Sequence, residues 1–136
     1  FFFSSRRRHT RLRTVTEFRR VLFRSSSYSA SLALKIGTAD ARINAILAFS
    51  PGEYFKGELN VKESIKDLNK PTYVTSSKEE APLVKALVKG HDLVKQFIPT
   101  GAGIHGSSAL WPGTKDNQEY WASVKSFLEF ARTWKP

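Results

Sequence analysis

The chain has 136 residues, a net charge of +10, and neither cysteine nor methionine. This length allows one domain, and the lack of cysteine excludes a disulfide framework, thiol catalysis and a thiolate metal site. No run of about 18 apolar residues is present, which excludes a membrane-spanning helix.

The N-terminal segment, residues 1–25 (FFFSSRRRHTRLRTVTEFRRVLFRS), has a net charge of +7, whereas residues 26–136 carry only +3. An arginine-rich, acid-poor stretch is typical of a transit peptide or of a nucleic-acid-binding arm. Through SSRRRHTRL and EFRRVLFRS it also resembles translated sequencing adapter, the interpretation we favour. We therefore expect residues 1–25 to be non-native and disordered, with VLF mimicking a strand by accident, and we expect no nucleic-acid partner. Since position 1 is not methionine, we expect a fragment or a processed product.

Residues 26–136 are predicted to form one partial domain in which helices and strands alternate. Apolar residues at helical spacing predict helices, with glycine as a stop and proline in the first turn. Short apolar or β-branched runs predict buried strands. In chain order we expect a helix over 29–37 ending at Gly37, a strand over 43–51, one or two amphipathic turns over 61–69 (Val61, Ile65 and Leu68 on one face), a strand over 71–77, a helix over 80–90, a strand over 94–101, and a closing helix over 118–133 that buries Trp121, Val124, Phe127, Leu128 and Ala131.

This alternation predicts an α/β fold with a mainly parallel sheet flanked by helices. Parallel strands are covered on both faces, which agrees with the continuous apolar runs. Three strands are few for this architecture. We therefore interpret the chain as the C-terminal part of a larger α/β domain, truncated at its N-terminus.

A serine cluster, SSSYSAS over 25–31, follows the N-terminal segment and precedes the first predicted helix. In a nucleophile elbow of pattern G-x-S-x-G, a serine sits on a tight turn between a strand and a helix. Ser27 falls at the nucleophile position, while Ser25 and Ser29 stand where the pattern has glycine. Taken alone, a serine-rich stretch is more often a loop or a helix cap than a nucleophile.

Further candidate catalytic residues follow two of the later predicted strands. Lys78-Glu79-Glu80 follows the strand over 71–77, and either glutamate suits a triad acid, with Glu80 favoured because it lies three residues after the small Ser77. His105 lies in the glycine-rich loop PTGAGIHGSSALW (99–111). The order serine, acid, histidine is the order of the α/β-hydrolase triad.

With the candidate serine, acid and histidine in this order, the chain resembles the dienelactone-hydrolase-like branch of the α/β-hydrolase superfamily. The matching stretches are SSYSASLAL, AFSPGEYF, PTYVTSSKEE and IHGSSALW. The resemblance spans residues 26 to about 130, roughly the C-terminal half of such a domain. It implies a serine hydrolase, or esterase, that cleaves ester or related acyl bonds. Its triad would be Ser27, His105 and Glu80, with Glu79 as the alternative acid, and the backbone N–H of Tyr28 would serve as one oxyanion-hole donor.

The implied mechanism requires neither a metal nor an organic cofactor, and its partner is a small-molecule ester or acyl substrate. Because we interpret the chain as truncated, we expect it to be inactive by itself. The departures from glycine at Ser25 and Ser29 leave one alternative open, a non-catalytic binding module of the same shape.

Overall fold

The computed structural model describes residues 21–55 and 57–135 of the chain. The described part contains four strands, four α-helices and one 3₁₀ helix. In chain order they are β1 (Val21–Ser26), α1 (Tyr28–Ala39), β2 (Ile43–Phe49), α2 (Val61–Ser64), β3 (Thr72–Thr75), α3 (Ala81–Leu87), β4 (Val94–Phe97), the 3₁₀ helix η1 (Gly106–Leu110) and α4 (Asn117–Thr133).

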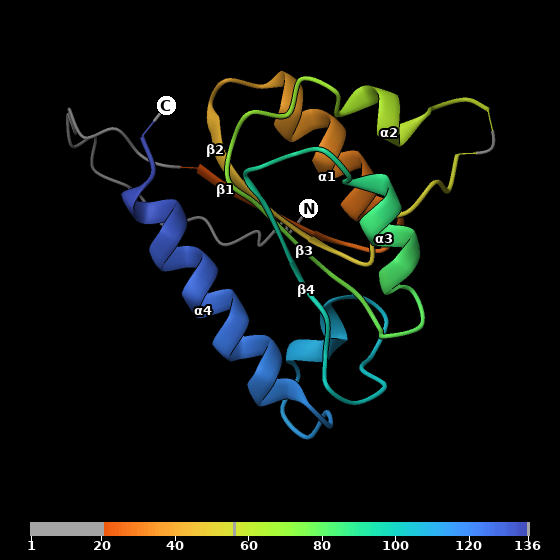
Figure 1. The fold of residues 1–136 in the computed structure, drawn as a ribbon, viewed down its shortest axis with the longest axis vertical. Helices are drawn as coiled ribbons and strands as arrows, with labels where there is room; N and C mark the ends of the chain where they lie inside the picture. Colours follow the sequence, from red (N-terminus) through yellow and green to blue (C-terminus); the bar gives the residue numbers. More distant parts are fainter. Residues whose placement is uncertain (1–20, 56, 136) are drawn as a thin grey trace, which may run out of the picture.

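The four strands form one sheet in the order β1-β2-β3-β4, and every neighbouring pair is parallel. Parallel neighbours need a crossover connection, and α1, α2 and α3 supply one between each successive pair (Figure 1). The α/β prediction, with a mainly parallel sheet flanked by helices, is confirmed. Because all strands run the same way, their carboxyl ends meet at one edge of the sheet.

The first strand departs from the sequence prediction. Residues 21–26 pair in parallel with β2, from Val21 opposite Ile43 to Ser26 opposite Phe49, with one register shift after Val21. The run VLF at 21–23 is thus part of the sheet, and the structured region begins before the predicted boundary at residue 26. Residues 1–20, the rest of the predicted non-native segment, lie outside the described residues.

Two apolar clusters cover the two faces of the sheet, as a parallel sheet requires. The first joins alternate β2 residues such as Ile46 and Ala48 to α1, α2 and α3. The second joins Leu47 and Phe49 to α4 and η1. The alternation along β2 follows from the two-residue period of a strand. This packing of helices on both faces holds the sheet in place, and the candidate site lies at its carboxyl edge.

Helix α1 packs directly on β2, and Gly37 makes this close approach possible. The helix runs on to Ala39, so the prediction that Gly37 ends it is wrong. A Cβ atom at Gly37 would lie 2.4 Å from the Cδ1 atom of Ile46. Glycine is therefore needed at this position for packing, not for termination of the helix.

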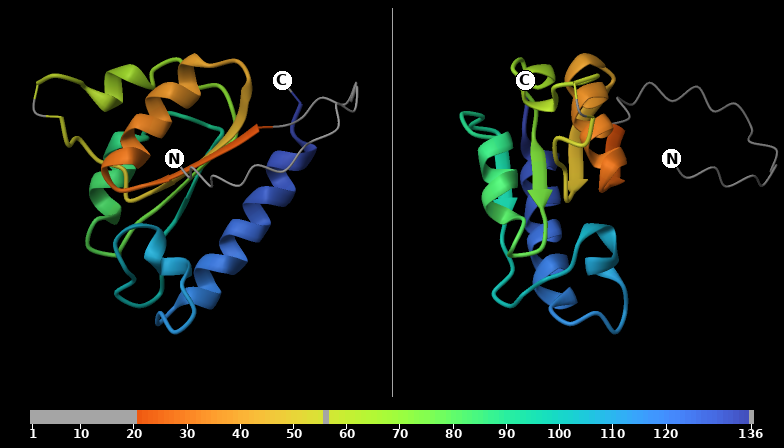
Figure 2. Two further views of the ribbon diagram at one scale, coloured as in Figure 1. Left: turned by 180° about the vertical axis from the view of Figure 1, so that it is seen from behind. Right: turned by 90° about the vertical axis from the view of Figure 1, so that its right-hand side faces the viewer.

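Helix α4 closes the second face, beside η1 (Figure 2), and its buried side differs in part from the predicted one. Tyr120, Val124 and Phe127 are buried at the spacing of one helical face. Trp121 and Leu128, which were expected in the core, are 40% and 37% exposed. No helix in the described part of the chain is both long and apolar enough to cross a bilayer.

Candidate active site

The candidate site lies at the carboxyl edge of the sheet, where a polar residue follows each strand. Ser27 follows β1, Ser50 follows β2, Glu80 lies in the turn after β3, and His105 lies in the loop after β4. Ligand sites in open parallel sheets lie outside the carboxyl ends of the strands. The topology therefore collects residues from four distant parts of the sequence at one place.

Ser27 occupies a strained turn between β1 and α1. Its φ of 55° and ψ of −130° lie in a region that residues other than glycine rarely adopt. Its backbone N–H donates to the Phe49 carbonyl at 2.7 Å, which ties the turn to β2. The serines at the two glycine positions of the pattern also contact one another, since Ser25 Oγ donates to Ser29 Oγ at 2.6 Å. A strained turn between a strand and a helix is what the prediction of a nucleophile elbow at Ser27 requires.

Three side chains form a continuous chain of hydrogen bonds. The Nε2 atom of His105 lies 2.8 Å from Ser27 Oγ. Its Nδ1 atom lies 2.5 Å from the Oε1 atom of Glu80. The two contacts use opposite nitrogens of one imidazole, so the ring links the hydroxyl to the carboxylate. Glu79, the alternative acid, is exposed and forms no such contact in the described structure.

The second carboxylate oxygen of Glu80 is held by serines. Oε2 accepts hydrogen bonds from Ser50 Oγ at 3.0 Å, and from the Ser77 N–H at 3.2 Å and Oγ at 3.0 Å. Partial burial by itself raises the pKa of Glu80. The hydrogen bonds from His105, Ser50 and Ser77 outweigh burial, so that the pKa lies below its ordinary value. The carboxylate is thus kept charged and fixed in orientation.

Ser50 was not identified from the sequence, yet it connects two parts of the site. It is 1% exposed and has a φ of 53°. Its Oγ donates to Glu80 and accepts the Gly106 N–H at 2.9 Å. One hydroxyl therefore holds both the acid and the loop that carries His105. The only sequence signal was its place between the buried strand and Pro51.

The histidine loop is fixed from a second direction by Ser26. Ser26 Oγ accepts the Ser107 N–H at 2.9 Å. Gly106, the residue before Ser107, has a φ of 75°, and a Cβ there would lie 2.6 Å from Ser26 Oγ. Glycine is therefore required on both conformational and steric grounds. This accounts for one of the glycines that surround His105 in the sequence.

Tyr28, the expected oxyanion-hole residue, is the first residue of α1. The first backbone N–H groups of a helix have no acceptor within the helix, and the positive end of its dipole lies there. The Tyr28 ring is 53% exposed and lies 4.4 Å, between ring centroids, from the Phe55 ring. Its side chain thus faces the loop after β2, next to Ser27.

The described residues offer no site with the ligands of a metal ion. Within 21–55 and 57–135, no group of three or more histidines, aspartates and glutamates is arranged to hold a metal ion. Every buried side-chain nitrogen or oxygen in those ranges has a hydrogen-bond partner.

Comparison of the chain with protein-family models, with curated proteins and with solved structures returns no match in any of the three.

Proposed function

We propose that the chain is part of a serine hydrolase that cleaves ester or related acyl bonds, with Ser27 as nucleophile, His105 as general base and acid, and Glu80 as the acid that orients the imidazole. The observation that carries the proposal is the pair of hydrogen bonds on the two nitrogens of His105. The parallel sheet and the chain order of the three residues support membership of the α/β-hydrolase superfamily, in its dienelactone-hydrolase-like branch.

In the proposed first step, Ser27 Oγ forms a bond to the acyl carbon of the ester. The proton of the hydroxyl passes to Nε2 of His105, which lies within direct reach. The carbonyl π-bond electrons move onto oxygen, and the Tyr28 N–H donates to this oxyanion. The tetrahedral intermediate then breaks its bond to the alcohol, which takes the proton from His105. Water repeats the sequence on the acyl-enzyme and releases the acid.

Glu80 acts through His105 and neither forms nor breaks a bond in this scheme. Its Oε1 atom accepts from the Nδ1–H, which places the lone pair of Nε2 toward Ser27. Its lowered pKa means that the carboxylate is ionised when the imidazolium forms, so the two opposite charges attract. The acid therefore stabilises the charged state that proton transfer produces.

A serine-reactive fluorophosphonate probe tests the proposal on the chain itself. The probe forms an Oγ–P bond and releases fluoride, and the reaction requires an activated serine. We expect peptide mapping by mass spectrometry to place one label on Ser27. The Ser27→Ala variant should remain unlabelled, whereas the control variant Ser126→Ala, at an exposed position on α4, should label as the unmodified chain does. A label distributed over several serines, or none, would contradict the proposal.

The same samples distinguish the alternative, a non-catalytic binding module. A binding module predicts a folded chain without a label on Ser27. Turnover of a simple ester is a separate readout, because it also depends on oxyanion stabilisation, for which the sequence identifies only the Tyr28 N–H. A labelled chain without turnover would agree with the expectation that the chain alone is inactive. Turnover that is lost in Ser27→Ala would refute that expectation.

A further inference from the structure

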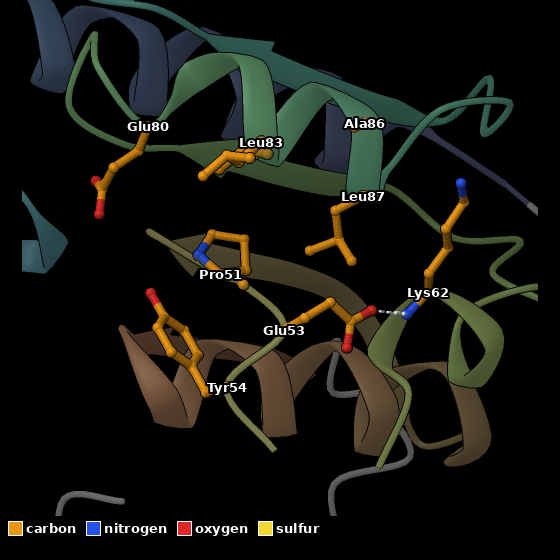
Figure 3. Close-up of a pocket in the computed structure, with 10 residues that line it drawn as sticks. Pro51, Glu53, Tyr54, Lys62, Glu80, Leu83, Ala86 and Leu87 are labelled. Carbon is orange, nitrogen blue, oxygen red and sulfur yellow. Dashed lines mark hydrogen bonds between the residues drawn. The ribbon is translucent and has the colours of Figure 1, made fainter. Parts of the chain in front are cut away.

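A cavity of about 520 Å³ lies between the loop after β2 and helix α3, and it begins at the triad acid (Figure 3). Its wall is mainly apolar, formed by Pro51, Tyr54, Leu83, Val84, Ala86 and Leu87. This volume falls within the range of about 300–1,000 Å³ that is typical of small-molecule sites, and such sites are apolar with few polar groups. The cavity thus has the size and lining of a ligand site.

Two contacts connect one end of the cavity to the proposed catalytic residues. Glu80 lines that end, and its carboxylate binds His105. Tyr54 lines it as well, and the Tyr54 ring lies 6.4 Å, between centroids, from the ring of Tyr28. The Tyr54 hydroxyl donates to the Ser50 carbonyl at 2.9 Å, which holds the ring at the site. One end of the cavity therefore lies near the side chain of Tyr28.

Apolar side chains at the cavity are left facing solvent. Leu83 is 75% exposed and Tyr54 is 40% exposed. Leu83 lies one helical turn after Glu80, so it extends the apolar wall away from the acid (Figure 3). Exposed apolar groups gathered at a concave site are typical of ligand binding. An apolar group in the cavity would cover both of these side chains.

The charged groups on the wall do not compete with an apolar ligand. Both carboxylate oxygens of Glu53 accept hydrogen bonds at the start of α2, one from the Val61 N–H at 2.8 Å and one from the Lys62 N–H at 2.7 Å. Figure 3 shows Lys62 at the end of the cavity remote from Glu80. The wall between the two ends is therefore mainly hydrocarbon, and the volume of about 520 Å³ accommodates an alkyl chain and not only a methyl group.

We infer that this cavity holds an apolar chain of the ester substrate, on its acyl or its alcohol side; this inference rests on the proposed hydrolase function. The substrate class is then an ester that carries a medium-length alkyl chain. Each additional buried CH₂ group contributes about 0.8 kcal/mol, which is about a fourfold change in affinity. An octyl ester should therefore bind far more tightly than its short analogue.

Methyl NMR of leucine side chains in the Ser27→Ala chain tests binding without reaction. The ligands are ethyl octanoate, octyl acetate and ethyl acetate. We expect saturable shifts of Leu83 and Leu87, with at least one long ester binding tenfold or more tighter than ethyl acetate, and no shift at Leu47 on the other face of the sheet. Whichever long ester binds more tightly identifies the side of the ester that enters. Equal binding of all three esters, or no saturable shift, would overturn the inference.

Two variants of the Ser27→Ala chain test the cavity directly, one by filling it and one by replacing an apolar side chain of its wall, and a third variant is the control. Ala86→Trp fills the cavity and should weaken binding of the long ester at least tenfold, whereas Lys85→Trp adds the same ring to a neighbouring residue that does not line it and should leave binding unchanged. Leu83→Asn, at an exposed position, should weaken binding without affecting folding. Unchanged binding in Ala86→Trp and Leu83→Asn would overturn the inference. Absence of a fluorophosphonate label on Ser27 would instead contradict the hydrolase proposal, and the assignment as a substrate site would then fall with it.

Discussion

Replacement of His105 by alanine is expected to slow fluorophosphonate labelling of Ser27 by about 10²–10⁴-fold, the range for loss of a general base. The imidazole is the group within 2.8 Å of Ser27 Oγ that can take its proton. Without it, the hydroxyl keeps its ordinary, weak nucleophilicity. The rate constant of labelling, followed by mass spectrometry of the intact chain, measures the effect.

The control for this prediction is His91→Ala. His91 precedes β4 and therefore lies toward the opposite edge of the parallel sheet, and its side chain forms no contact with Ser27 or Glu80 among the described residues. This variant should label at the parent rate. His105→Gln, which keeps a polar side chain but supplies no base, should be as slow as His105→Ala. A labelling rate in His105→Ala within a factor of three of the parent would contradict the assignment of the base.

Replacement of Ser50 by alanine is expected to disturb both the acid and the histidine loop. The variant leaves the buried Gly106 N–H without its acceptor and removes one donor from Glu80. An unsatisfied buried group costs about 1–3 kcal/mol of folding free energy. Labelling of Ser27 should slow about tenfold, which corresponds to about 1.4 kcal/mol in the barrier. Ser50 is thus expected to act as a positioning residue.

The pH dependence of stability separates this positioning role from a general packing effect. The folded pKa of Glu80 lies below its ordinary value. Its stabilising contribution is therefore present above about pH 5 and is lost as the pH falls through the lower folded pKa. Because the Ser50 hydrogen bond helps to lower this pKa, its removal raises the pKa toward the ordinary value. The loss of unfolding free energy in Ser50→Ala should thus be largest near neutral pH and smaller in acid.

Two further variants make this result decisive. Ser76→Ala removes another buried serine hydroxyl at the end of a strand. Within the part of the chain that the structure describes, this hydroxyl donates to the Ser77 carbonyl and not to a titratable group, so its effect should not vary with pH. Ser50→Gly also lacks the hydroxyl but relieves the positive φ at this position, so it should fold while still labelling slowly. If Ser50→Gly labels at the parent rate, Ser50 does not position the triad.

The α/β class and the three candidate residues could be predicted because their signals are local. The apolar run at 43–51, which ends at Pro51, corresponds to β2. Ser27, Glu80 and His105 each follow a strand in the structure. In a parallel sheet, residues that follow strands share one edge. Their convergence therefore follows from the topology, although their catalytic role remains a prediction.

Other features depend on contacts between distant segments, which no local pattern reports. Ser50 resembles any turn serine until β2 is placed beside β3 and its hydroxyl meets Glu80 and Gly106. Tyr120, and not Trp121, is fully buried in α4, and its hydroxyl donates to the Ser76 carbonyl and accepts the Ile104 N–H, two partners from other parts of the chain. The pairing of residues 21–26 with β2 likewise depends on a partner elsewhere in the chain.

Proton NMR of the His105 ring tests the central claim most directly. A hydrogen bond from Nδ1–H to a carboxylate moves that proton resonance strongly downfield. Such a resonance is predicted in the parent chain and in Glu79→Gln, and it should be lost in His105→Ala and shifted upfield in Glu80→Gln, where a neutral amide replaces the carboxylate. Absence of this resonance from the parent chain, or a shift on substitution of Glu79 but not of Glu80, would contradict the proposed link between Glu80, His105 and Ser27.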